Sequence, residues 1–170
     1  MKQWSIWSAS LLLLCACEDR VSESPVPAGL VRYSCNPTLV NIYMEQGDPQ
    51  VPLESTCGWV RLHDASRRVG NEAWGTGGLL LVHGFEQNHF YAYDLACPYC
   101  YAIGAKASTR IHQIEVNQAD MKAYCPTCES QFGAIFWGSS APTAGPANEH
   151  NYPLRQYRVS LLGEILTVTR

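Results

Sequence analysis

Positive charge is scarce in this chain. Of its 170 residues 16% are charged, and 12 Lys and Arg against 15 Asp and Glu give a formal net charge of −3. Proteins that bind nucleic acids neutralise phosphates with an excess of basic side chains, so this balance argues against a nucleic-acid partner. Apolar residues make up 46% of the sequence, which is typical of a chain that folds around a core, and the length suits one domain.

Long apolar runs and helical periodicity are also absent. The most apolar run, at residues 11–14, is far shorter than the roughly 20 residues that a membrane-spanning helix needs. No longer segment repeats apolar side chains at helical spacing. The sequence also lacks a Ser/His/Asp arrangement, a paired-carboxylate motif and a glycine-rich phosphate loop. We therefore expect neither a helical fold nor an enzyme.

The N-terminus is typical of an export signal. Lys2 and a short apolar run make residues 1–16 a signal peptide. The residues Leu14-Cys15-Ala16-Cys17 resemble a bacterial lipobox, which implies cleavage before Cys17 and acyl chains on that residue. Cys15 is the other candidate, but Leu14 is too large for the position before a cleavage site. The alternative is a signal peptide that is cleaved without lipidation.

A tether and a β domain follow. Residues 17–30 combine the lipidated cysteine with two prolines, two serines and one glycine, which predicts a flexible tether. The domain is expected at residues 31–170. Its short alternating or apolar segments, separated by Gly, Pro and Asn, predict a small all-β antiparallel sandwich or barrel. The expected strands are residues 38–44, 58–62, 79–82, 90–95, 111–116, 132–137, 156–161 and 164–168.

Two C-x-x-C pairs are the strongest signal. Cys97 and Cys100 enclose Pro-Tyr, Cys125 and Cys128 enclose Pro-Thr, and 24 residues separate the pairs. Each pair follows an expected strand, and two such loops facing one another supply four thiolates to one tetrahedral ion. The alternative is that the pairs form two disulfides, although such small loops gain little chain entropy.

A dithiol redox site is the third interpretation, because C-P-Y-C is also the active-site tetrapeptide of glutaredoxins. That chemistry needs the first cysteine at a helix N-terminus, where the helix dipole lowers its pKa. Here Gly104 follows Cys100 closely, so we expect no helix after the first pair.

From Phe90 to the C-terminus the chain resembles the Rieske iron–sulfur domain. The family's first loop is C-P-H or C-T-H after a strand, and residues 95–99 read LACPY. Its second loop is C-P-x-H-x-S-x-F/Y, and residues 125–132 read CPTCESQF. The family's tail motifs G-P-A, P-L and Y-x-V stand at residues 145–147, 153–154 and 157–159, before a last strand at 163–168. The resemblance implies a Rieske-like β fold with two cysteine-bearing loops.

Departures from the family decide the chemistry. A Rieske [2Fe–2S] cluster is bound by two Cys and two His, but Tyr99 and Cys128 stand at the two His positions. What remains is a four-cysteine site, which suits one Zn²⁺, one Fe as in rubredoxin, or an all-cysteine [2Fe–2S] cluster. No twin-arginine pair precedes the apolar run, so we expect export of an unfolded chain. Such export argues against a preassembled cluster and favours zinc.

Two further assignments concern the cysteines. Ser130 occupies the family position whose hydroxyl bonds a cluster sulfur, which implies that it contacts a thiolate here. Cys35 and Cys57 remain after the other cysteines are assigned. An even remainder in an oxidising compartment predicts one disulfide between them, and the alternative is two buried free thiols.

The sequence as a whole predicts a lipid-anchored protein of the bacterial cell envelope, with its domain outside the cytoplasm and the membrane as its partner. One metal centre on the four cysteines, zinc in first place, would serve a non-catalytic accessory or binding domain. The alternatives are an electron carrier with iron or a [2Fe–2S] cluster, and a thiol–disulfide redox protein.

Overall fold

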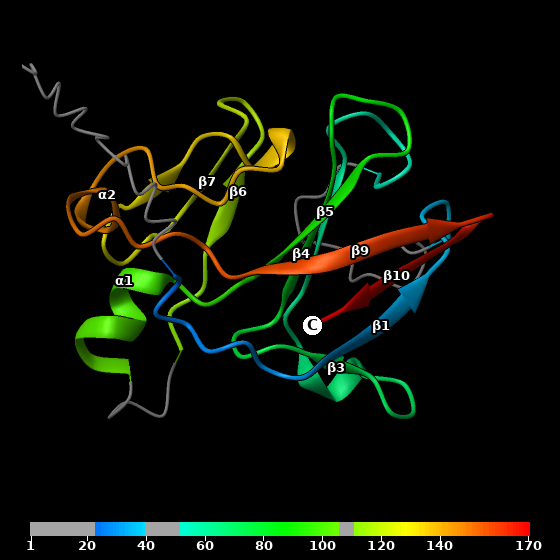
Figure 1. Cartoon of the computed structure of the whole chain (residues 1–170), viewed down its shortest axis with the longest axis horizontal. Coiled ribbons are helices and arrows are strands. Elements are labelled where there is room, and N and C mark those ends of the chain that lie inside the picture. Colours follow the sequence, from blue (N-terminus) through cyan, green and yellow to red (C-terminus); the bar gives the residue numbers. More distant parts are fainter. Residues whose placement is uncertain (1–22, 40–51, 106–110) are drawn as a thin grey trace, which may run out of the picture.

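The computed structural model describes residues 23–39, 52–105 and 111–170 (Figure 1). The strands are β1 (Val31–Cys35), β2 (Trp59–Leu62), β3 (Ala73–Trp74), β4 (Leu79–His83), β5 (Phe90–Asp94), β6 (Glu115–Asn117), β7 (Lys122–Tyr124), β8 (Gln131–Phe132), β9 (Gln156–Leu162) and β10 (Ile165–Thr169). The helical segments are η2 (Ala65–Arg67), α1 (Pro98–Cys100), η3 (Tyr101–Ala105), η4 (Ile135–Trp137) and α2 (Pro146–Glu149). The predicted all-β class is confirmed. Within the described ranges, every helix is too short or too polar to cross a bilayer.

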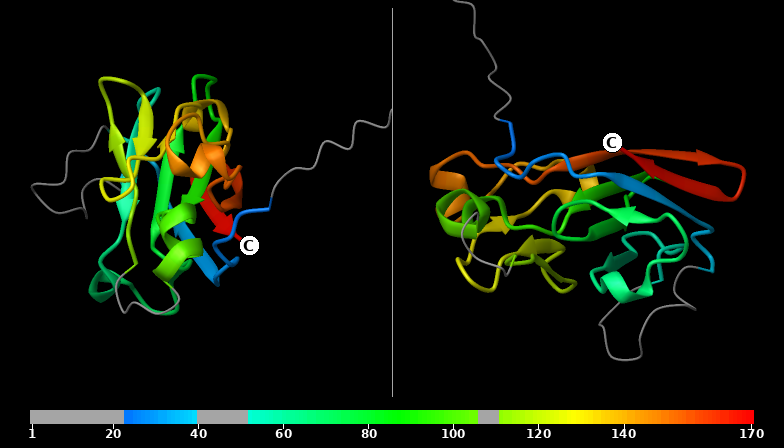
Figure 2. Two further views of the ribbon diagram at one scale, coloured as in Figure 1. Left: turned by 90° about the vertical axis from the view of Figure 1, so that its left-hand side faces the viewer. Right: turned by 90° about the horizontal axis from the view of Figure 1, so that it is seen from below.

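The strands form two antiparallel sheets. The larger sheet has seven strands in the order β2-β4-β5-β9-β10-β1-β3, and the smaller has three in the order β6-β7-β8. The link between the two halves of the larger sheet is narrow, because β5 and β9 share only the register pairs Ala92–Tyr157 and Tyr93–Gln156. Figure 2 shows β4 and β5 between the small sheet on one side and β1, β9 and β10 on the other.

Strand β4 is buried on both of its faces, which explains its continuous apolar sequence. Leu79 and Leu81 are fully buried in one core cluster, with residues of β1, β3, β9 and β10. Leu80 and Val82 are fully buried in a second cluster, formed with the small sheet and the cysteines at residues 97, 100 and 125. Since successive strand residues point to opposite faces, only a strand covered on both sides is apolar throughout.

Several expected strands differ from the structure. Residues 132–137 were expected to form one strand, but β8 ends at Phe132 and η4 begins at Ile135. Gly138 closes η4 in the left-handed conformation with φ of 78°, which favours glycine. Strand β6 starts at Glu115, later than the expected range of 111–116. Residues 38 and 39 of the expected strand 38–44 lie in a turn, and the rest of it falls outside the described residues.

The ordered domain begins earlier than the sequence predicted. Residues 23–30 were assigned to the flexible tether, but Val26 is fully buried. Arg155, near the C-terminal end of the sequence, donates hydrogen bonds to the carbonyls of Ser24 and Val26, each at 2.8 Å. The Pro- and Ser-rich composition of these residues is typical of a linker. It does not predict that an arginine far away in the sequence binds their backbone carbonyls.

The buried carboxylate of Asp94 connects three parts of the fold. Its Oδ1 accepts hydrogen bonds from the backbone N–H groups of Gly77 and Ala96, each at 2.8 Å. Its Oδ2 accepts from the Thr76 N–H and the Tyr157 hydroxyl, each at 2.7 Å. Burial raises the pKa of Asp94, and the four hydrogen bonds oppose that shift. All four partners are donors, so the charged carboxylate satisfies the site.

Replacing Asp94 with Asn tests this connection. Whichever way the new amide is oriented, its NH₂ group faces at least one backbone N–H donor, which loses its acceptor. We expect Asp94→Asn to lower the free energy of unfolding by about 1–3 kcal/mol, measured by urea denaturation. Asp120→Asn is the control, because Asp120 is exposed. Equal effects of both substitutions would contradict the role assigned to Asp94.

Candidate metal centre

The first cysteine loop begins where β5 has ended and α1 starts. The Cys97 N–H donates to the His112 carbonyl at 2.8 Å, and its own carbonyl accepts from the Tyr101 N–H at 2.9 Å. Tyr101 has helical backbone angles, so the chain continues through η3 to Ala105. The expectation that no helix follows the first pair was therefore wrong. Gly104 lies inside this helical segment. A glycine weakens a helix but does not prevent it when the preceding turn is already hydrogen-bonded.

The second cysteine loop is a tight turn between β7 and β8. The Cys125 N–H donates to the Ser130 carbonyl, and the Glu129 N–H donates to the Cys125 carbonyl, each at 2.9 Å. Glu129 adopts a left-handed backbone with φ of 59°, which returns the chain into β8. Thr127 Oγ1 lies 3.0 Å from His112 Nδ1 in a hydrogen bond. Since the His112 carbonyl accepts from the Cys97 N–H, His112 connects the two cysteine loops.

The two loops bring four sulfurs into one cluster. All four Sγ atoms of Cys97, Cys100, Cys125 and Cys128 lie within 4.8 Å of one another. Across the loops, Cys97 Sγ lies 3.5 Å from Cys128 Sγ, and Cys100 Sγ lies 3.8 Å from Cys125 Sγ. A zinc–sulfur bond of about 2.3 Å places the corners of a tetrahedron about 3.8 Å apart. The cluster therefore has the size of a single tetrahedral metal site.

The four thiols are free and mostly buried, which bears on the other two interpretations. None of the four is in a disulfide, and Cys97 and Cys125 are fully buried. Their mutual hydrogen bond lowers the pKa of Cys125 to about 5 and raises the pKa of Cys97. Burial raises the pKa of Cys100 to about 12. A redox nucleophile is accessible and has a lowered pKa, and neither thiol of the first pair meets both conditions.

Ser130 contacts the cluster where the sequence resemblance placed it. Its Oγ lies 3.2 Å from Cys128 Sγ and accepts a hydrogen bond of 3.0 Å from the Ala147 N–H. Ser130 and Ala147 are both fully buried. The hydroxyl therefore links the second cysteine loop to α2, which covers the cluster.

Cys35 and Cys57 do not form the expected disulfide. Both are free thiols in the structure. Cys35 packs beside the cluster that contains Tyr33, whereas Cys57 belongs to the opposite cluster with Trp59. An even number of leftover cysteines does not show on which side of a sheet each will lie.

An aromatic group that no sequence pattern predicted lies beside the first loop. Tyr99 lies between two of the cysteines, and its ring centroid is 5.6 Å from that of His150. His150 in turn stacks on Tyr152 at 5.4 Å with an interplanar angle of 19°. No spacing in the sequence connects these residues, because α2 brings the last two to the cluster only in the folded chain.

Comparisons with known proteins add little to this picture. No protein-family model matches the chain, and no curated protein matches it. Among solved structures, it is similar to the ferredoxin of carbazole 1,9a-dioxygenase from Nocardioides aromaticivorans IC177, with 20% identity and a TM-score of 0.36. That match covers 68% of this chain and 98% of the ferredoxin.

Substituting Ser130 tests its link to α2. Ser130→Ala leaves the buried Ala147 N–H without an acceptor, so we expect the free energy of unfolding to fall by about 1–3 kcal/mol, measured by chemical denaturation. Ser160→Ala is the matched control, because Ser160 is exposed on β9. A loss no greater than that of the control would show that the hydroxyl does not hold α2.

Proposed function

We propose that this protein is a lipid-anchored protein of the bacterial cell envelope whose β domain holds one structural zinc ion. Cys97, Cys100, Cys125 and Cys128 would bind the ion. The observation that carries the proposal is the mutual approach of the four sulfurs within 4.8 Å. Bound there, zinc would supply a redox-inert cross-link between the two loops.

The sulfur separations favour one ion over a [2Fe–2S] cluster. In an all-cysteine cluster two cysteines bind each iron, and bridging sulfides separate the irons, so sulfurs on different irons lie further apart than sulfurs on one ion. Here the close contacts of 3.5 and 3.8 Å run between the loops, and no pair exceeds 4.8 Å. That compact arrangement supports a mononuclear site.

A structural role follows from the number of ligands. Four thiolates complete the coordination of a tetrahedral ion. They leave no open position for water or substrate, whereas a catalytic zinc needs such a position. The loops belong to separate parts of the chain, and the strands of the small sheet are only two or three residues long. Such short strands need additional support, which an ion bound to both loops would provide. A non-catalytic accessory or binding domain is the role that fits.

An iron-containing electron carrier is the second candidate. Cys128 is partly exposed, unlike the other three cysteines, so an iron ion at this site would have one ligand near the surface for electron exchange. The two candidates differ in colour: a zinc protein is colourless, whereas iron bound by four thiolates absorbs visible light.

Lipid anchoring depends on residues that the structure does not describe. Cys17 and the signal peptide fall outside the described ranges, so the proposal depends on the Leu-Cys-Ala-Cys sequence at residues 14–17. Two or more acyl chains on one cysteine give stable attachment where a single chain does not. The membrane would then be the protein's first partner.

Metal analysis of the purified chain tests the zinc site. We expect one zinc per chain and a loss of bound zinc in Cys128→Ser as large as in Cys97→Ser. A structural site contributes roughly 10 kcal/mol or more to folding, so both variants should unfold at lower temperature. Cys35→Ser is the control, because Cys35 is a free thiol in the other core cluster.

Cys128→His sharpens that test. Zinc also accepts three Cys and one His, so this variant should keep more metal than Cys128→Ser. Stoichiometric iron in protein prepared with both metals present would support the electron carrier instead. Protein without metal under reducing, metal-replete conditions would overturn both candidates.

Membrane fractionation tests the anchor. Cys17→Ala should prevent lipidation and move the protein to the soluble fraction or block its processing. Cys15→Ala is the control, and it should stay in the membrane fraction. A wild-type protein that is cleaved and soluble, with no acyl mass on Cys17, would refute lipidation.

A further inference from the structure

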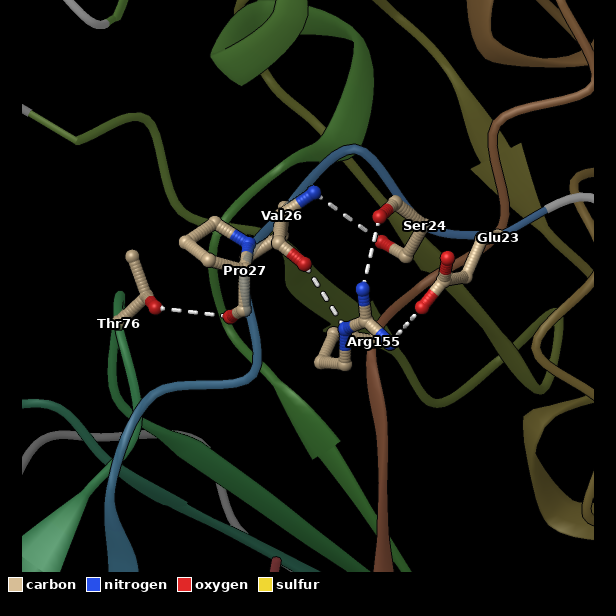
Figure 3. A network of polar contacts seen from close by, with 6 residues as sticks. All are labelled: Glu23, Ser24, Val26, Pro27, Thr76 and Arg155. Carbon is tan, nitrogen blue, oxygen red and sulfur yellow. Dashed lines mark hydrogen bonds and ion pairs between the residues drawn. The ribbon is translucent and has the colours of Figure 1, made fainter.

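The guanidinium of Arg155 holds the first described residues of the chain (Figure 3). Its Nε donates to the Val26 carbonyl and its Nη2 to the Ser24 carbonyl, each at 2.8 Å. Its Nη1 also lies 3.8 Å from the exposed Glu23 carboxylate. Because the Arg155 side chain is only 17% exposed, the two backbone bonds are largely shielded from water. They fix the point at which the chain reaches the domain.

The rest of this segment, residues 23–30, is bonded along its length, and we call it the strap. The Pro27 carbonyl accepts from Thr76 Oγ1 at 3.1 Å, and the Leu30 carbonyl accepts from the Gly75 N–H at 3.0 Å. At Gly29 the strap approaches the turn so closely that a Cβ atom would lie 2.7 Å from the Gly75 carbonyl carbon. The strap therefore runs in a defined course to β1 and is not part of a free linker.

A docked strap leaves a short connection to the lipid. Six Cα–Cα steps separate Cys17 from Glu23, which gives a reach of at most about 22 Å when fully extended. If residues 23–30 were free, the connection from Cys17 to Val31 would span fourteen steps, or up to about 50 Å. By holding the strap, Arg155 thus keeps the domain close to the bilayer.

The strap begins at the end of the molecule that carries the metal centre. Figures 1 and 2 show its first residues toward the end that carries α1 and α2, while the tip of the β9–β10 hairpin lies at the opposite end. The surface at the metal end includes Ile103, which is 65% exposed, and the partly exposed rings of Tyr99 and Tyr152. Aromatic rings with a polar tip are the side chains enriched at membrane–water interfaces.

The opposite end is harder to bring to the membrane. Leu162 at the hairpin tip is 85% exposed, but six strand steps separate it from Gln156, next to the strap's arginine, or about 20 Å. If the hairpin end faced the bilayer, the connection from Cys17 to Glu23 would have to be almost fully extended, at a large cost in conformational entropy. If the metal end faces the bilayer, that connection does not need to be extended.

We propose that the metal-bearing end of the domain, with Tyr99, Ile103 and Tyr152, lies against the lipid headgroups, and that Arg155 sets this orientation by holding the strap. This inference rests on the proposed lipid anchor. The metal centre then lies next to the bilayer, and the β9–β10 hairpin points away from it.

Photo-crosslinking of the full lipidated chain tests the orientation. A p-benzoylphenylalanine residue is placed at position 103 in one variant and at position 162 in another, and each is reconstituted into vesicles of phosphatidylethanolamine and phosphatidylglycerol. We expect several-fold more lipid adduct at position 103. Both variants are checked for metal content, since position 103 is close to Cys100.

Releasing the strap tests the role of Arg155. In the variant that is labelled at position 103, Arg155→Ala should lower the lipid adduct several-fold, because the longer free tether lets the domain leave the surface and turn. Arg158→Ala is the matched control, an exposed arginine on β9 three residues after Arg155, and it should leave the adduct unchanged. The comparison of positions 103 and 162 stands even if Arg155→Ala fails to fold.

The outcomes separate the anchor from the orientation. If mass spectrometry of the membrane-bound protein shows no acyl chains on Cys17, the proposed lipid anchor is overturned. A lipidated protein with equal adducts at the two positions, or with more at position 162, overturns the orientation alone. An Arg155→Ala variant that is folded and crosslinks like the wild type overturns the strap's role.

Discussion

Burial of strand β4 on both of its faces is the constraint on which the two halves of the domain depend. Its odd-numbered leucines face the cluster formed with β1, β3, β9 and β10, and Leu80 and Val82 face the cluster formed with the small sheet. A strand without a solvent-facing side needs a cover on each side. On one face of β4 lie the other strands of the larger sheet, β1, β3, β9 and β10. On the other face lie the small sheet and the cysteine loops.

The second cover is the weaker one. Its three strands have only two or three residues each, too few to be stable without other support. Side chains of the cysteine loops fill part of this core, and Ser130 ties the second loop to α2. An ion bound by both loops would complete a layer that backbone pairing alone holds poorly. The metal centre is thus part of the core as much as it is a site.

Asp94 and Arg155 join these layers to the N-terminal segment. Asp94 bonds the turn at residues 76–77, the start of the first cysteine loop and Tyr157 on β9. Arg155, two residues before Tyr157, bonds the strap. One short stretch of β9 and its lead-in therefore connects the first cysteine loop to the N-terminal segment. With the proposed lipid anchor, the attachment to the membrane and the four cysteines would lie at the same end of the molecule.

The sequence by itself determined the all-β class, most of the strands and the four cysteines that meet. These features depend on local chemistry: alternation marks strands, and two C-P-x-C turns each aim two sulfurs the same way. It did not determine the fate of Cys35 and Cys57, the docking of residues 23–30, or the helical turn after Cys100. Each of these depends on partners far away in the chain, such as Arg155 for the strap and opposite faces of the sheet for the two cysteines. Only the tertiary structure decided them, because local composition does not record which distant group will satisfy a buried carbonyl or cover an apolar side chain.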